Sequence, residues 1–114
     1  MQSKKFIDIF ESISKMFNAC SKKSNKLSFT CGPRVNNQMQ WIIDKEADVD
    51  FENDSPKKII RKIFSQKSLT IILTEEAVNI TFCSFKFPSM SFTEFEENGQ
   101  KFITEAIKNM MSDQ

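Results

Sequence analysis

The sequence predicts a single α+β domain over residues 1–114, in which a mainly antiparallel five-stranded sheet packs against helices. Apolar residues recur every three or four positions near both ends of the chain, which is typical of amphipathic helices. In the middle they alternate with polar residues, which is typical of half-buried strands. A length of 114 residues suits one domain. The predicted element order is α-β-β-β-α-β-β-α.

A first helix is predicted over residues 3–20. Its apolar side chains share one face, so this helix should lie on an apolar surface. The residues on that face are Phe6, Ile9, Phe10, Ile13, Met16, Phe17 and Cys20.

Three strands are predicted next. The first alternates over residues 27–31 and ends at Gly32-Pro33, and the second covers residues 38–43. The third, over residues 47–52, has the most regular alternation and should present one apolar face and one carboxylate face. Its apolar residues are Ala47, Val49 and Phe51, and its acidic residues are Asp48, Asp50 and Glu52.

A second helix is predicted over about residues 56–66, with Ser55 as its N-cap and Pro56 at its first position. It has two distinct faces, and we expect the sheet to bury the apolar one, as it should bury the apolar side of every element. The apolar arc contains Ile59, Ile60, Ile63 and Phe64, and the cationic residues are Lys57, Lys58, Arg61 and Lys62.

A hairpin is predicted over residues 69–82, with its turn at Glu75-Glu76. The apolar phase then changes, which predicts a bulge or bend near Cys83-Ser84. A last helix, over residues 91–111, begins with capping-box spacing. Gly99 interrupts this helix and marks either close helix packing or a break; we favour one helix.

Charge is strongly segregated, although the net charge is only +1. Residues 44–54 contain six acids and one Lys, and residues 55–68 contain five cations and no acid. These two blocks either pair with each other across the junction between strand and helix, or form a bipolar surface, acidic on one side and basic on the other, that orients a charged partner. The charged-surface residues are Lys57, Lys58, Arg61, Lys62, Asp48, Asp50 and Glu52.

The composition excludes several kinds of active site. Without His there is no Ser-His-Asp or Cys-His catalysis, and two glycines cannot form a phosphate-binding loop. Cys20, Cys31 and Cys83 lack CxxC spacing and are expected as reduced, buried thiols. The acidic series from Asp48 to Asp54 also lacks the Gly and the Glu that a calcium loop requires. We therefore predict no enzymatic activity, cofactor, metal site or small-molecule substrate.

The sequence contains no apolar stretch long enough for a membrane span and no continuous apolar region like that of a signal peptide. We expect a cytoplasmic or nuclear protein that does not associate with membranes.

The primary functional hypothesis is a protein-interaction module or adaptor, acting as a homodimer or in a hetero-complex. Its partner would dock on exposed apolar surface. The candidate residues are Phe85, Phe87, Met90 and Phe92 around Pro88, together with Trp41 on the sheet. The alternative interpretation of this cluster is a packed corner at the end of the sheet.

The runner-up hypothesis is nucleic-acid binding. Clustered cations neutralise phosphates, and the basic residues 57–62 would act with a second group of cations. That group consists of Lys22, Lys23, Lys26 and Arg34.

Two resemblances concern element order alone. The helix over 6–20, the strands, the Ile-Ile-x-x-Ile-Phe helix over 56–64 and the following hairpin resemble one subdomain of a sliding clamp. This resemblance implies a nucleic-acid-binding accessory protein. The complete order is also similar to that of small type III secretion chaperones, which implies a dimer that binds extended segments of other proteins.

Overall fold

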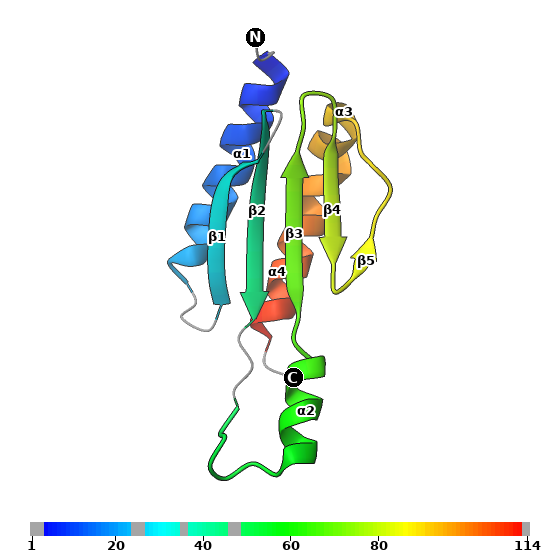
Figure 1. Ribbon diagram of the computed structural model, residues 1–114. Coiled ribbons are helices and arrows are strands. Elements are labelled where there is room, and N and C mark those ends of the chain that lie inside the picture. The colour runs from blue at the N-terminus through cyan, green and yellow to red at the C-terminus, as the bar shows by residue number, and fades with distance from the viewer. Residues whose placement is uncertain (1–3, 24–26, 35–36, 46–48, 113–114) are drawn as a thin grey trace.

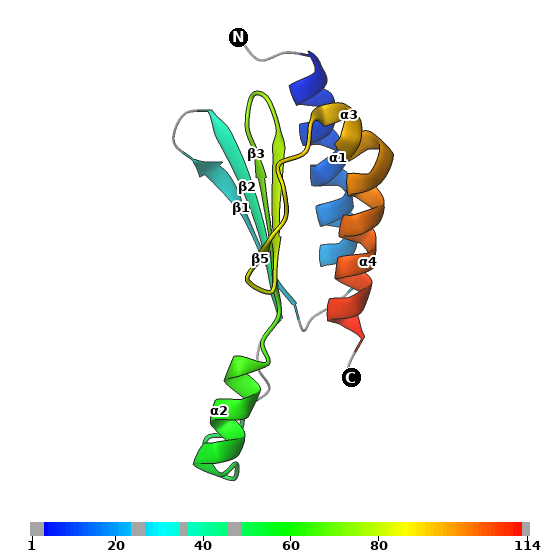
Figure 2. The same ribbon diagram turned by 90° about the vertical axis from the view of Figure 1, so that its right-hand side faces the viewer.

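The computed structural model describes residues 4–23, 27–34, 37–45 and 49–112. One antiparallel sheet has its five strands in chain order, and helices cover one of its faces (Figures 1 and 2). The predicted α+β class and the five-stranded sheet are thus confirmed. The strands are β1 (Leu27–Arg34), β2 (Gln38–Lys45), β3 (Ser68–Leu73), β4 (Val78–Phe82) and β5 (Phe85–Lys86). The helical elements are α1 (Lys4–Ser21), α2 (Pro56–Phe64), α3 (Phe92–Glu94), the π-helical turn η1 (Phe95–Gly99) and α4 (Gln100–Met111).

The core lies between the sheet and the layer formed by α1 and α4 (Figure 2). Burial alternates along β3, where Leu69, Ile71 and Leu73 are buried and the residues between them are half-buried, as period-two spacing predicts. Trp41 of β2 is also buried, and its ring lies 5.6 Å from that of Phe10 in α1. The helices contribute Phe6, Ile9, Ile13 and Phe17 from α1, and Ile103, Ala106, Ile107 and Met110 from α4.

Strand boundaries differ from the sequence prediction at two places. β1 continues through Gly32-Pro33, because Pro is tolerated on an edge strand and β1 is the edge of this sheet. The predicted strand over 47–52 is wrong in its described part, since Val49 to Glu52 belong to no strand, while Ala47 and Asp48 lie outside the described residues. The fifth strand of the sheet is instead β5, which follows β4.

Cys83 and Ser84 form a two-residue turn between β4 and β5. Both residues have positive φ, 50° and 73°, and Phe82 pairs with Phe85 across them. Two consecutive positive φ values are characteristic of a type I′ turn, whose twist matches that of the strands it connects. Of the predicted bulge or bend, the structure has the bend, in the form of a tight reversal of the chain. The expectation of buried thiols is wrong for Cys83 in this turn and for Cys31 on β1, which are both exposed, whereas Cys20 is half-buried.

Gly99 does not break the last helix. The backbone stays helical through η1, and Gly99 leaves room for the ring of Phe95, which is fully buried. A Cβ atom at position 99 would collide with that ring. The N-cap prediction at the start of this segment is confirmed, because Ser91 Oγ accepts a hydrogen bond from Glu94 N at 3.1 Å.

None of the helices in the described ranges is both long and apolar enough to cross a membrane.

Replacing Cys83-Ser84 by Asn-Gly should stabilise the protein. Asn and Gly adopt positive φ at low cost, so the free energy of unfolding should rise by about 1 kcal/mol. Urea denaturation measures this change. The control Ser84→Ala keeps a Cβ atom at a positive-φ position and should give no gain. An equal gain in both variants would contradict the turn assignment.

Gly99→Ala should destabilise the protein, although Ala is the better helix former by about 1 kcal/mol. The added methyl group would displace the Phe95 ring from a fully buried site, at a cost of about 1–3 kcal/mol. The exposed neighbour Asn98 provides the control, since Asn98→Ala should be neutral or slightly stabilising. Thermal unfolding of the two variants tests the prediction, which fails if Gly99→Ala is the more stable.

Candidate functional site: a projecting helical arm

The most unusual feature of the structure is a helical arm, which we define as residues 49–67 between β2 and β3. α2 lies beyond the end of the sheet, apart from the layer formed by α1 and α4 (Figures 1 and 2). The molecule consequently measures 53 × 25 × 22 Å along its principal axes. At the root of the arm, Lys45 N donates a hydrogen bond to Lys67 O at 2.9 Å, and Lys67 Nζ donates one to Asn109 Oδ1 of α4 at 2.5 Å.

The expectation that the sheet buries the apolar face of α2 is wrong. No residue of α2 is buried; Ile60, Ile63 and Phe64 are 55%, 46% and 84% exposed. The physical reason is topological. β2 and β3 are antiparallel neighbours, so the segment between them leaves and re-enters the sheet at the same end. The helical face of the sheet is already covered by α1 and α4.

The start of the arm is a turn organised by the carboxylate of Asp50. Its Oδ1 accepts hydrogen bonds from Glu52 N (3.0 Å) and Asn53 N (3.2 Å), and its Oδ2 accepts one from Asn53 Nδ2 (2.7 Å). The bonds from Asn53 and Glu52 hold the pKa of Asp50 below its ordinary value. This local bonding satisfies backbone donors that a strand would need for its ladder, which explains the missing strand. Phe51, within the turn, is exposed.

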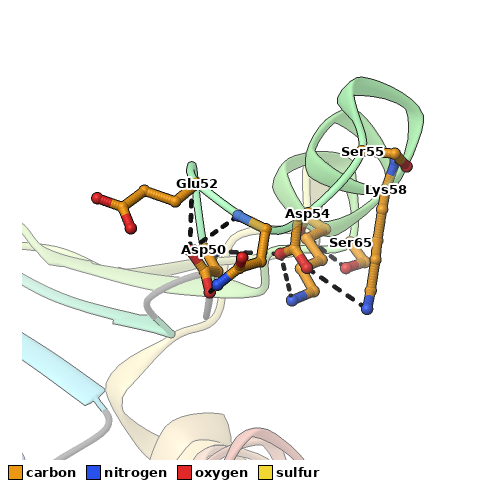
Figure 3. Close-up of polar contacts among 8 residues, drawn as sticks. Asp50, Glu52, Asp54, Ser55, Lys58 and Ser65 are labelled. Carbon is orange, nitrogen blue, oxygen red and sulfur yellow. Dashed lines mark hydrogen bonds and ion pairs between the residues drawn. The ribbon is translucent and has the colours of Figure 1, made fainter.

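Asp54 connects this turn to α2 (Figure 3). Its carboxylate is 2.8 Å from Lys62 Nζ and 3.4 Å from Lys58 Nζ, and it also accepts a hydrogen bond from Asp50 N at 3.0 Å. The hydrogen bond from Lys62, followed by that from the Asp50 backbone, lowers the pKa of Asp54 to about 2. Ser55 caps the helix by accepting from Lys58 N at 3.2 Å, as the sequence predicts.

The expected pairing of the acidic and basic blocks therefore occurs, but only on one edge of α2. Lys58 and Lys62 share Asp54, whereas Lys57 and Arg61 are exposed and make no ion pair with any residue that the structure describes. Helical spacing places Lys57 and Arg61 along the edge formed by Ile60 and Phe64. The apolar face of α2 is thus bordered by one edge whose two lysines share the Asp54 carboxylate and by a second edge of exposed cations.

The Phe cluster around Pro88 is mainly a packed corner, the alternative interpretation of this cluster. The ring centroid of Phe87 lies 4.5 Å from that of Phe102 and 4.6 Å from that of Phe85. Phe87, Met90 and Phe92 are all half-buried. Met90 and Val78 also exchange backbone hydrogen bonds of 2.9 Å. Phe85 alone of this group is largely exposed, at 60%. Trp41, predicted as a partner contact, is a core residue because its strand position faces α1.

The described cations among those proposed for nucleic-acid binding lie at more than one end of the sheet. Lys22 and Lys23 are exposed where α1 ends, whereas Arg34 ends β1 beside the β1–β2 turn, at the opposite end of the sheet (Figure 1). Lys26 and the side chain of Arg34 lie outside what the structure describes, as does Asp48.

No three acidic or thiol side chains among the described residues come together as metal ligands. A small crevice between the sheet, α1 and α4 is lined only by apolar side chains, which cannot orient or protonate a substrate. The residues lining it are Ile13, Met16, Phe17, Ile43, Ile71, Ile103 and Ile107.

Comparisons of the chain with models of protein families, with curated proteins and with solved structures found no match. The function of the arm is therefore inferred from its geometry and chemistry alone.

The exposed apolar face of α2 is the functional candidate that the sequence interpretation missed. The sequence predicts an amphipathic arc for its residues but places that arc in the core. One feature of the sequence could have indicated this exposure: the helix lies between two segments with strand alternation. If those two strands pair directly with each other, a short helix between them projects from the end of the sheet. The third strand predicted over 47–52 concealed that signal.

Asp54→Asn should loosen α2 without unfolding the sheet, because it removes the charge that holds Lys58 and Lys62 and caps the turn. Amide hydrogen exchange should accelerate in α2 and stay unchanged in β3. The control Glu52→Gln alters an exposed neighbour and should leave both rates unchanged. Equal protection of α2 in the two variants would show that Asp54 does not hold the arm.

The same contacts predict acid sensitivity of the arm. The pKa of Asp54 is lowered in the folded protein, from an ordinary value of 3.8 to about 2, by hydrogen bonds from Lys62 and the Asp50 backbone. The stabilisation is present above pH 3.8 and is lost as the pH falls towards 2. NMR titration should show the α2 amide signals changing together with the Asp54 carboxyl. An α2 that keeps its helical shifts at pH 2 would contradict this.

Proposed function

We propose that this protein is a non-enzymatic protein-interaction module that docks a partner protein on the apolar face of α2. The observation that carries the proposal is a helix with exposed Ile60, Ile63 and Phe64, held outside the core by its own turn. Helices with apolar residues at spacings of three and four dock into grooves of partner proteins, where these side chains act as anchors.

The energetics of the arm support docking over a purely structural role. A helix of nine residues is marginal in water, and most helical stability in proteins comes from packing of an apolar face. α2 has no buried residue in the described structure, and polar contacts with the turn that precedes it hold it instead. Exposed isoleucine and phenylalanine side chains gain about 1.5–3 kcal/mol each when fully buried, which a partner can provide.

The partner is a different protein rather than a second copy. Between Pro56 and Phe64, α2 carries four cations and no acid. Packing two such helices face to face would bring cation-bearing edges together, and like charges across an interface oppose association. The apolar face is also small, so we expect the reversible binding typical of small interfaces rather than an obligate dimer.

Nucleic-acid binding is less well supported. Asp54 already engages two of the four cations of α2, and the acidic turn beside it adds negative potential next to any bound phosphate. The exposed apolar residues would serve no purpose in phosphate neutralisation.

Phe64→Ser should leave stability nearly unchanged, within about 0.5 kcal/mol, because the side chain is almost fully exposed. Trp41→Ala, by contrast, should cost about 3–5 kcal/mol, because it opens a cavity in the core. Urea denaturation of both variants checks the assignment. A loss of several kcal/mol in Phe64→Ser would mean that this face is part of the folded core.

Peptides selected for binding from a displayed library of random 16-residue segments should recognise α2. Their affinity, measured by fluorescence anisotropy, should fall at least tenfold with Phe64→Ser. The matched control is Phe85→Ser, which changes the exposed Phe of the packed corner and should leave binding intact. Loss of binding in Phe85→Ser with retention in Phe64→Ser would place the docking surface at the corner and refute the arm.

A further inference from the structure

We propose that the segment docking on α2 is an acidic amphipathic helix. Its apolar side chains would cover Ile60, Ile63 and Phe64, and its carboxylates would pair with Lys57 and Arg61. This inference rests on the proposed function and adds the chemistry of the partner.

The difference between the two edges of α2 is the first argument. Lys62 Nζ and Lys58 Nζ lie 2.8 Å and 3.4 Å from the Asp54 carboxylate, whose side chain is only 9% exposed. No acid of the described chain forms an ion pair with Lys57 or Arg61, and both side chains are exposed. The cationic edge is thus available to a partner, whereas the other edge has its counter-ion within the arm.

The proximity of these cations to the apolar face is the second argument. Lys57 precedes Ile60 by three residues and Arg61 precedes Phe64 by three, so each cation lies beside an apolar side chain that a partner must cover. Docking there removes water from both cations, which is unfavourable unless carboxylates replace it. Arg61 suits this role well, because its guanidinium binds a carboxylate through two hydrogen bonds.

The charges of the arm also determine how such a segment lies. The turn that precedes α2 carries Asp50 and the exposed Glu52, so it repels acids at the N-terminal end of the arm. The cationic edge extends along the helix from Lys57 to Arg61. An acidic helix therefore lies alongside α2, with its carboxylates on the Lys57–Arg61 edge and away from the turn.

The other occupants fit less well. A second copy of α2 brings only cations to this edge. The acidic surface of another copy would make a head-to-tail contact, which extends into open chains rather than a closed dimer. A nucleic acid would satisfy Lys57 and Arg61 but would leave the apolar side chains exposed to water.

Three fluorescent peptides test the inference with the full-length protein. All are 16-residue amphipathic helices: one has a Leu face flanked by Glu, one has the same face flanked by Lys, and one keeps Glu but carries Ser in place of Leu. Anisotropy at about 0.1 M salt gives the affinities, and amide shifts of α2 locate the site. We expect the Glu-flanked Leu peptide to bind at least tenfold more tightly than either of the others.

Charge reversals identify the edge that is used. The double variant Lys57→Glu with Arg61→Glu should lower the affinity for the Glu-flanked Leu peptide at least tenfold and raise the affinity for the Lys-flanked peptide. The matched control is Lys22→Glu with Lys23→Glu, which makes the same change in net charge at the end of α1 and should change both affinities less than twofold. Circular dichroism checks that the variants remain folded.

The outcomes separate the inference from the function on which it rests. If the Glu-flanked and Lys-flanked peptides bind equally and Phe64→Ser weakens both, apolar docking stands and the acidic partner is refuted. If the Ser peptide or a 20-base-pair DNA duplex competes as well as the Glu-flanked Leu peptide, the site is purely electrostatic and both proposals fail. A mass that rises with concentration in the absence of peptide, and that Phe64→Ser abolishes, would assign the face to a second copy and likewise refute both.

Discussion

The direct pairing of β2 with β3 is the constraint on which the rest of this structure depends. Their register extends from Met39 opposite Leu73 to Asp44 opposite Ser68, and the bond from Lys45 N to Lys67 O continues it to the root of the arm. Everything between these strands must leave and return at one end of the sheet. Since α1 and α4 already cover the helical face of the sheet, the helix inserted there contributes no residue to the described core.

Local polar chemistry then gives the arm a defined shape. Asp50 organises the turn, and Asp54 links that turn to Lys58 in the first turn of α2 and to Lys62 in its last turn. Carboxylates of this kind hold a short helix without burying apolar surface, which leaves Ile60, Ile63 and Phe64 available. The same arrangement divides the cations of α2 into an edge whose lysines share Asp54 and an edge that is accessible to a partner.

The sequence predictions are right where the structure of an element depends only on its own residues. The helical faces of residues 3–20 and 91–111, the hairpin over 69–82 and the capping residues Ser55 and Ser91 all follow from local spacing. They failed where the alternation of residues 47–52 predicts a strand, because the hydrogen bonds that the Asp50 carboxylate accepts from Glu52 and Asn53 compete with a sheet ladder. The assignment of Trp41 to a partner surface failed because strand alternation gives two faces but does not say which one the helices cover.

The sequence by itself determined which residues lie together on each helix or strand face, since that depends only on the 3.6-residue and two-residue periods of the backbone. It also determined that α2 is two-faced and cationic. Only the tertiary structure decided whether each apolar face is buried. Burial depends on which strands are neighbours and on what already covers the sheet, and these are relations between segments far apart in the chain. Phe64 and Leu69 show this difference. Each belongs to the apolar face of its own element, α2 or β3, yet Phe64 is 84% exposed and Leu69 is fully buried.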